Sequence, residues 1–387
     1  MAALLVGGLA PRLWLAFSFY GVPNDINAYH LVWSALQTDA LHVYSTVNAT
    51  IGAYGLRLFH WPYPPGFFPW IAAAGTLSAS TAIPFYAWIK LPAVYADCVI
   101  ALLIQWYLGL QGVTKRRRLA AFALVMFGPS FWLISGFHGQ FDAFAILPAL
   151  FAFVLWERLS GERRAVAAGS LIGVAGALKL VPLAMALALL PTARSRREGA
   201  ALLLLPPALL AISLTPFALA DPHGVMALRS FQGLPGIGGI SLLIQPRFAR
   251  FWLYNVPTNL SAATLALIRV GGLWNEAIVL LVGLLLFLRH TPAATAAVLI
   301  WLAVYSFGSA FAMQYLVWGL PFFLLANKIE WVAVIEALIV VPLILLYGHV
   351  AIPHGLAVYV AFMGLIWLIF VYWFLRTGWS VLRAVAH

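Results

Sequence analysis

The sequence is poor in charge, and acids are the scarcest charged residues. Only 9% of the 387 residues are charged and 11 are Asp or Glu, whereas 64% are apolar and the mean hydropathy is +0.97. A chain of this composition cannot form a soluble globular domain, because its apolar surface would exceed any core that it could bury. The sequence also has no low-complexity linker and no convincing internal repeat. We therefore expect a single transmembrane domain over residues 1–387.

Cysteine is nearly absent as well. The chain contains one cysteine, Cys98, which excludes an intrachain disulfide and a metal cluster held by thiolates. Cys98 lies within an apolar run, so we expect a packed thiol there.

What the sequence has in abundance is runs of about 20 apolar residues, the length that crosses a bilayer as a helix. They predict an all-α polytopic membrane protein. The first run is interrupted by Arg12 and has no basic start, so we expect a retained span there rather than a cleaved signal peptide. The predicted spans cover residues 2–20, 82–110, 119–135, 142–156, 199–220, 273–288, 294–311, 313–326, 331–347 and 356–375.

Basic residues outnumber acids and give a net charge of +11. Fourteen of the 22 Lys and Arg lie in short segments between or after the apolar runs. Such segments are retained in the cytoplasm and set the topology of a membrane protein. We therefore interpret the positive charge as a signal that orients the chain in the membrane, rather than as a nucleic-acid binding surface. The fourteen are Lys115–Arg118, Arg158, Arg163, Arg164, Arg194, Arg196, Arg197, Arg289, Lys328, Arg376 and Arg383. Short soluble loops and an Ala/Leu/Arg-rich composition favour a bacterial plasma membrane.

Two apolar stretches do not fit simple spans. Residues 166–190 lie between two basic segments and must cross an even number of times, so we predict a pair of short helices broken near Lys179 and Pro182. Residues 67–80 are short and flanked by proline, and charge parity suggests a half-helix or shallow dip. Broken helices at membrane depth are tolerated where protein or a wet cavity satisfies their backbone. The sequence therefore predicts a cavity.

If the basic segments are cytoplasmic, residues 21–66, 136–142 and 221–257 face the other side of the membrane. These loops carry much of the polar chemistry of the chain, including Asp25 and His138. We therefore expect the functional site on the extracytoplasmic face.

Asp25 begins the first of these loops. The residues after it are apolar or aromatic at helical spacing and predict a short amphipathic helix on the membrane surface. Two roles for Asp25 remain open from this pattern. It is either the N-cap of that helix, with Asn24 competing for the position, or a catalytic carboxylate.

Further polar residues are candidates for a binding site. His138, Gln140 and Asp142 either bind a phosphate or sugar or cap the helix that begins at Asp142. Lys179 lies inside an apolar run, where an ionisable residue indicates function unless it snorkels to an interface. Gln314 and Tyr315 form a weaker pair, which interhelical hydrogen bonding would also explain.

The loop over 221–257 carries Arg229 and Arg247. These arginines suit either a phosphate or lipid headgroups. A second loop feature, Trp61-Pro62-Tyr63-Pro64-Pro65-Gly66, predicts a stiff aromatic corner that returns the chain to the bilayer.

Five motifs occur in a fixed order along most of the chain: Asn24-Asp25-Ile26-Asn27, Tyr63-Pro64-Pro65, His138-Gly139-Gln140-Phe141-Asp142, Leu178-Lys179-Leu180-Val181-Pro182 and Gln314-Tyr315-Leu316-Val317-Trp318. In this order they resemble the GT-C superfamily of membrane glycosyltransferases, which use polyprenyl-phosphate sugars. Similar strings occur in the catalytic subunit of the GPI mannosyltransferase and in bacterial polyprenol-phosphate-mannose transferases.

The resemblance implies a GT-C-like bundle of roughly 10–13 transmembrane helices, with short broken or re-entrant helices and an amphipathic helix in the first extracytoplasmic loop. Residues 1–220 would form the catalytic module, and residues 221–387 a loop and variable helices. The implied activity is transfer of a hexose, with mannose preferred, from a polyprenyl-phosphate donor to a glycan or lipid acceptor. The donor or phosphate-binding residues would be His138, Gln140, Asp142, Lys179, Arg229, Arg247, Gln314 and Tyr315.

The same resemblance makes Asp25 the catalytic base. Its neighbours Asn24 and Asn27 cannot supply a second carboxylate, so we expect neither a divalent metal nor another cofactor. One carboxylate suffices for an inverting transfer, because polyprenyl phosphate leaves already charged. The alternatives are a transporter or flippase for a lipid-linked or small solute, and a non-catalytic scaffold.

Overall fold

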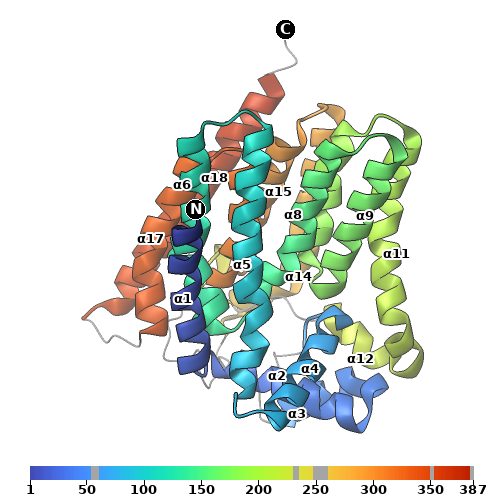
Figure 1. Cartoon of the computed structure of the whole chain (residues 1–387), viewed down its shortest axis with the longest axis vertical. Helices are drawn as coiled ribbons and strands as arrows, with labels where there is room; N and C mark the ends of the chain where they lie inside the picture. Colours follow the sequence, from blue (N-terminus) through green and yellow to red (C-terminus); the bar gives the residue numbers. More distant parts are fainter. Residues whose placement is uncertain (54–60, 230–234, 247–259, 349–352, 384–387) are drawn as a thin grey trace.

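A computed structural model of the protein describes residues 1–53, 61–229, 235–246, 260–348 and 353–383 (Figure 1). Throughout these residues the regular structure is helical and no strand occurs, which confirms the all-α prediction. The longer helices are α1 (Ala2–Ser18), α2 (Pro23–Thr38), α5 (Phe85–Leu110), α6 (Lys115–Phe127), α8 (Asp142–Arg158), α9 (Gly161–Leu178), α11 (Arg196–Ala220), α14 (Ala262–Leu288), α15 (Ala293–Phe307), α17 (Ile329–Tyr347) and α18 (Gly355–Arg383). The shorter ones are α3 (Val43–Ala53), α4 (Phe68–Ser80), α7 (Pro129–Phe131), α10 (Met185–Leu189), α12 (Pro222–Met226), α13 (Ile240–Ile244) and α16 (Leu316–Leu325).

The protein is a multi-pass membrane protein. Among the described residues, six helices are long and apolar enough to cross a bilayer, and the bent pair α1 and α2 would make a seventh. Shorter apolar helices, including α15 (Ala293–Phe307), lie beside them. By length and hydropathy alone, fewer of the described helices therefore qualify as spans than the roughly 10–13 that the resemblance implies.

The predicted spans correspond to helices, with one large difference in boundary. Helix α14 begins at Ala262, eleven residues before the predicted start at 273. Ser261 caps it by accepting a hydrogen bond from the backbone N–H of Thr264, and the first turns include Arg269. A hydropathy pattern does not register such a cap, and Arg269 interrupts the apolar residues between the cap and residue 273.

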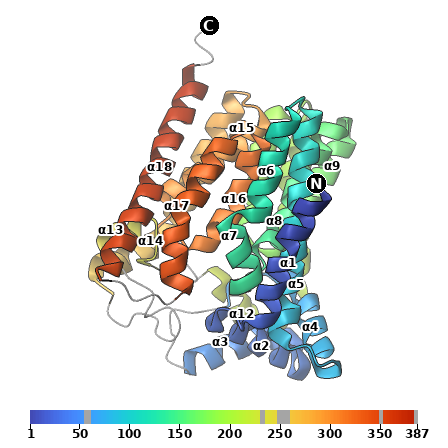
Figure 2. The same ribbon diagram turned by 60° about the vertical axis from the view of Figure 1, so that its left-hand side comes forward.

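The two ends of the bundle differ in chemistry. The basic segments between α5 and α6, between α8 and α9, and before α11 gather at one end (Figure 1). Helices α2, α3, α4 and α12 lie together at the opposite end, and a second view shows the same separation (Figure 2). The segregation of basic and polar loops expected from the sequence is thus present in the fold.

The predicted break near Lys179 and Pro182 is confirmed. Helix α9 ends at Leu178, Lys179 has extended backbone, and a 3-10 turn (Val181–Ala184) leads into α10. The helix before the break is longer than expected, because it begins at Gly161 and includes the basic segment. The break places Lys179 in the interior, where its side chain is buried.

Helix α2 buries Ile26, Tyr29, Val32 and Ala35, which recur every three residues along one face. This face packs on α4, the short helix that occupies the range 67–80 predicted as a half-helix or shallow dip. The cap of α2 is Val22, without a side-chain hydrogen bond, and Asp25 lies in the first turn. The N-cap role considered for Asp25 is therefore wrong, and its carboxylate is left for other contacts.

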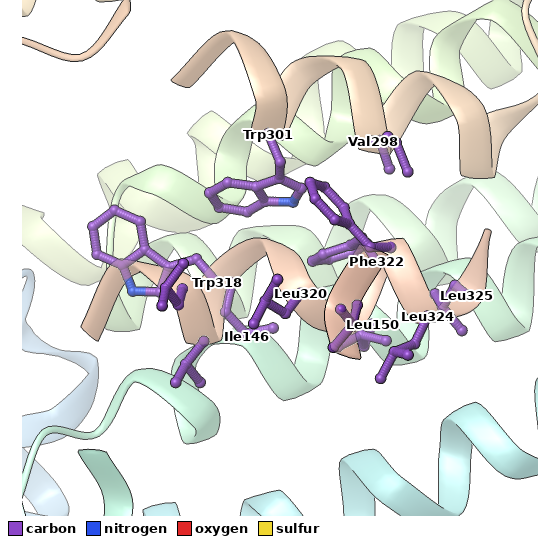
Figure 3. Packing of buried hydrophobic residues seen from close by; sticks show 14 of the residues in the cluster. Ile146, Leu150, Val298, Trp301, Trp318, Leu320, Phe322, Leu324 and Leu325 are labelled. Carbon is purple, nitrogen blue, oxygen red and sulfur yellow. The ribbon is translucent and has the colours of Figure 1, made fainter. Parts of the chain in front are cut away.

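Aromatic and aliphatic side chains join the two halves of the chain. Trp301 of α15 lies 5.9 Å from Phe322 of α16 between ring centroids, and both are fully buried (Figure 3). Leu150 of α8 faces the same cluster, and Trp318 lies at its edge. Close packing of this kind holds membrane helices together, since lipid tails are as apolar as the side chains.

A buried ion pair fixes α1 to α5 and α6. Arg12 Nε donates to Asp97 at 2.9 Å, and both side chains are fully buried. The same guanidinium donates to the carbonyls of Val125 and Met126 at the end of α6. Helix α6 stops at Phe127 just before Pro129, so those carbonyls lack the usual helical partners. Arg12 thus replaces the helical hydrogen bonds that the break removes.

Gly66 provides a test of how the aromatic corner is seated. A Cβ at this position would lie 2.5 Å from the carbonyl oxygen of Ala177, at the end of α9. Backbone atoms cannot yield as a flexible side chain would, so we expect Gly66→Ala to lower the free energy of unfolding by about 1–3 kcal/mol. Thermal unfolding in detergent measures the effect. Gly364→Ala in α18, where no atom lies within 4 Å, is the control, and equal melting temperatures for both variants would contradict the close approach.

Candidate active site

The carboxylate of Asp25 is held by two donors, His138 at the end of η3 (Trp132–His138) and Gln140 in the turn before α8. His138 Nε2 lies 2.6 Å from Asp25 Oδ2, and Gln140 Nε2 donates to Asp25 Oδ1 at 2.7 Å. Among the described residues each oxygen thus has one hydrogen-bond partner and keeps a lone pair for another. Asp25 remains 18% exposed while His138 is fully buried, so the acid is the accessible member of the group.

Backbone contacts explain why residues 25 and 138 meet. Val22 N–H donates to the carbonyl of His138 at 3.0 Å. Gly21 has a φ of +99°, and a Cβ there would lie 2.8 Å from the same carbonyl. The turn between α1 and α2 therefore needs glycine in order to lie against His138. This places Asp25, one helical turn later, beside the imidazole.

His138 is itself held in place from the far side. Its Nδ1 lies 2.6 Å from the hydroxyl of Tyr347, at the end of α17. An imidazole that carries its proton on Nε2 donates to Asp25 and accepts from Tyr347 on Nδ1. His138 ends a π-helical turn, and Gly139 follows with a φ of +93°. The segment is thus shaped to aim the ring at Asp25.

Lys179 and Asp142 form the second half of the site. Lys179 Nζ donates to Asp142 Oδ1 at 2.5 Å and to Gln140 Oε1 at 3.1 Å. The indole N–H of Trp318 also donates to Asp142, which is fully buried. The ammonium lies 4.6 Å from the ring centroids of both Tyr63 and Phe141. Lys179 is therefore paired and stacked in the interior, rather than snorkelling to an interface.

Gln140 connects the two halves. Its amide nitrogen donates to Asp25, while its amide oxygen accepts from Lys179. The network thus runs without interruption from Tyr347 through His138, Asp25 and Gln140 to the ion pair. The short stretch from the end of η3 to the start of α8 supplies His138, Gln140 and Asp142.

The site opens into a cavity of about 410 Å³. Asp25, Tyr63, Gln140 and Lys179 line one part of it. An apolar part is formed by Leu180, Val181, Ala184, Val279 and Val304. The cavity predicted from the broken helices is therefore present, with both polar and apolar walls.

The structure brings together most of the residues selected from the sequence. Asp25, His138, Gln140, Asp142 and Lys179 form the network, and Gln314 and Tyr315 line the same cavity. Tyr315 stacks on Trp318 with ring centroids 3.9 Å apart. Arg229 ends a 3-10 turn whose Leu228 lines the cavity. Arg247 lies outside the described residues.

Sequence reasoning missed three residues of the site. Tyr347 gave no signal, because tyrosine near the end of a span is common at membrane interfaces. Asn275 and Glu276 of α14 also line the cavity. An acid inside the predicted span 273–288 is as informative as a lysine inside an apolar run, so Glu276 was recognisable from the rule that selected Lys179.

The described residues contain no group of three or more His, Cys, Asp or Glu side chains that could hold a metal ion. No family model and no curated protein matches the sequence. Fold and site together define a polytopic helical membrane protein in which the accessible carboxylate of Asp25 lies at the wall of a cavity.

Proposed function

We propose that the protein is a membrane glycosyltransferase that moves a hexose from a polyprenyl-phosphate donor to a glycan or lipid acceptor. The observation that carries the proposal is Asp25, an accessible carboxylate oriented by His138 and Gln140 on the wall of a cavity. The ordered resemblance to GT-C glycosyltransferases supports the same activity and favours mannose as the sugar. The positive-inside rule supports a site on the extracytoplasmic side. Short soluble loops and an Ala/Leu/Arg-rich composition favour a bacterial plasma membrane.

Asp25 would act as the general base. An acceptor hydroxyl that attacks the anomeric carbon must lose its proton to a group about 3 Å away. His138 and Gln140 leave lone pairs of the carboxylate free for that proton, and Tyr347 fixes the imidazole that orients it. The bond from the sugar to the phosphate oxygen breaks as the new glycosidic bond forms, which inverts the anomeric centre.

Lys179 would stabilise the departing phosphate. It lines the cavity, and its bonds to Asp142 and Gln140 use two of the three N–H groups of an ammonium. A positioned cation is effective in a water-poor site, because little solvent competes with it. The apolar residues Leu180 and Val181 follow it in the chain and suit the first isoprene units of the donor.

A transfer assay tests the proposal. Purified protein in lipid vesicles receives radiolabelled polyprenyl-phosphate-mannose or -glucose together with octyl hexosides as acceptors. We expect label on the octyl hexoside and release of polyprenyl phosphate. Intact donors in every combination, together with flux of a labelled sugar into the vesicles, would instead establish the transporter.

Tyr347 should influence the rate through His138. We expect Tyr347→Phe to lower kcat roughly two- to tenfold, the equivalent of one hydrogen bond of about 0.5–1.5 kcal/mol. The KM for the donor should change less than twofold, since Tyr347 does not line the cavity. Initial rates over a range of donor concentrations separate the two parameters. A change confined to KM would show that Tyr347 acts on donor binding instead.

A further inference from the structure

A second polar wall of the cavity is assigned no role by the mechanism above. It consists of Asn275 and Glu276 on α14 and Gln314 in the 3-10 turn η8 (Met313–Tyr315) before α16. Here these three residues are called the α14 wall. The wall lies in a part of the chain that the catalytic network does not use.

Close helix packing explains why these residues share one wall. A Cβ on Gly271 would lie 2.3 Å from Ser309 Oγ, so α14 is pressed against the segment that follows α15. Asn275 lies one helical turn after Gly271 and therefore on the same face. Gln314 follows Ser309 by five residues, and both line the cavity.

The wall contains buried polar atoms without a protein partner. The side-chain oxygens of Asn275 and Gln314 are both buried, and neither has a hydrogen-bond partner among the described residues. A buried polar atom without a partner costs free energy, and its retention calls for a ligand or water. Glu276 adds a carboxylate within a membrane-spanning helix, where an acid is expensive unless it serves a function.

The chemistry of the wall selects hydroxyl groups over phosphate. An ionised carboxylate only accepts hydrogen bonds and repels an anion, whereas an amide accepts through its oxygen and donates through its NH2 group. Sugar hydroxyls both donate and accept, so they match a wall of one carboxylate and two amides. Among the described residues that line the cavity, Lys179 is the only Lys or Arg, and it belongs to the opposite, catalytic wall. A phosphate is therefore attracted to the ammonium of Lys179 and repelled by the carboxylate of Glu276 at the α14 wall. A saccharide ring, by contrast, offers several O–H donors.

We propose that the α14 wall binds the hydroxyl groups of the donor hexose and so distinguishes a sugar-bearing lipid phosphate from the bare lipid phosphate. The inference rests on the proposed function, because that function places the donor phosphate at Lys179. The sugar attached to this phosphate then lies in the same cavity, within reach of its second polar wall. Release of the product lipid follows naturally, since polyprenyl phosphate without its sugar has lost these contacts.

The test is a comparison of two dissociation constants. Binding of polyprenyl-phosphate-mannose and of bare polyprenyl phosphate is measured by quenching of tryptophan fluorescence in nanodiscs. The variants are Asn275→Leu with Glu276→Gln, and separately Gln314→Leu. Glu157→Gln, at an exposed acid of α8 away from the cavity, makes the same chemical change as a control.

We expect each wall variant to weaken binding of the mannosyl lipid about tenfold, the effect of losing one or two hydrogen bonds. Binding of bare polyprenyl phosphate should stay within twofold, which also shows that the variants are folded. Equal losses for both lipids, or no loss for either, would overturn the α14 wall as a sugar site while leaving the proposed function intact. Failure of the wild-type protein to bind either lipid would overturn the proposed function and this inference with it.

Discussion

Replacement of Asp25 by Asn is expected to lower kcat for hexose transfer by about 10²–10⁴, the usual contribution of a general base. Asparagine keeps the size and position of the side chain, but its amide does not take up a proton. In the wild-type protein the two carboxylate oxygens accept from His138 and Gln140, and the substitution replaces one of these oxygens with an NH2 group. Donor binding should remain within about twofold, since the phosphate and tail contact other residues. Initial rates with saturating donor measure the effect.

Asp39→Asn is the matched control. Asp39 lies at the other end of the same helix, is 58% exposed, and pairs with His42. Asp39→Asn makes the same chemical change as Asp25→Asn in the same loop, at a residue that does not line the cavity. Equal activity of wild type and Asp39→Asn is expected. A large loss in Asp39→Asn would mean that the helix tolerates no change and that the Asp25 result reports on folding.

Removal of Lys179 is expected to have the second large effect. In Lys179→Met, the buried carboxylate of Asp142 would lose its cation, and breaking a buried pair costs about 3–5 kcal/mol of stability. The double variant Lys179→Met with Asp142→Asn removes both charges, and methionine keeps the apolar stem between the rings of Tyr63 and Phe141. We expect the double variant to recover most of the lost stability.

Donor binding separates structure from function at this position. If Lys179 contacts the leaving phosphate, the stable double variant should still bind polyprenyl-phosphate-mannose at least tenfold more weakly than wild type. Melting temperature and donor dissociation constant are measured on the same preparations. Wild-type affinity in the double variant would show that the ion pair is structural alone.

The sequence predicts the class of the fold because hydropathy and helix length are local properties. The break at Lys179 was predictable for the same reason, since it combines a proline with a charge inside an apolar run. Boundaries set by polar caps were less accessible, and α14 begins at a serine cap that a hydropathy pattern does not register. The number of spans was harder to predict, because some of the described helices are bent or too short to cross a bilayer by themselves.

Most members of the network were predictable, with the exception of Tyr347, but the contacts between them were not. Asp25 and Lys179 stand out in an apolar chain, whereas the sequence does not say that Gln140 joins them. That contact depends on Gly21 and Gly139, whose backbone conformations bring three distant segments together. The structure excludes the N-cap role of Asp25, because Val22 caps α2 and the carboxylate contacts His138. The catalytic role remains a proposal.

A single-turnover experiment on wild type and Asp25→Asn tests the central proposal most directly. Both proteins are loaded with polyprenyl-phosphate-mannose, mixed with an octyl hexoside, and quenched over time. We expect wild type to form one glycosidic bond per site with inverted anomeric configuration and to release polyprenyl phosphate, while Asp25→Asn retains its bound donor intact. Transfer at the same rate by both proteins, or retention of configuration by wild type, would contradict a single general base at Asp25.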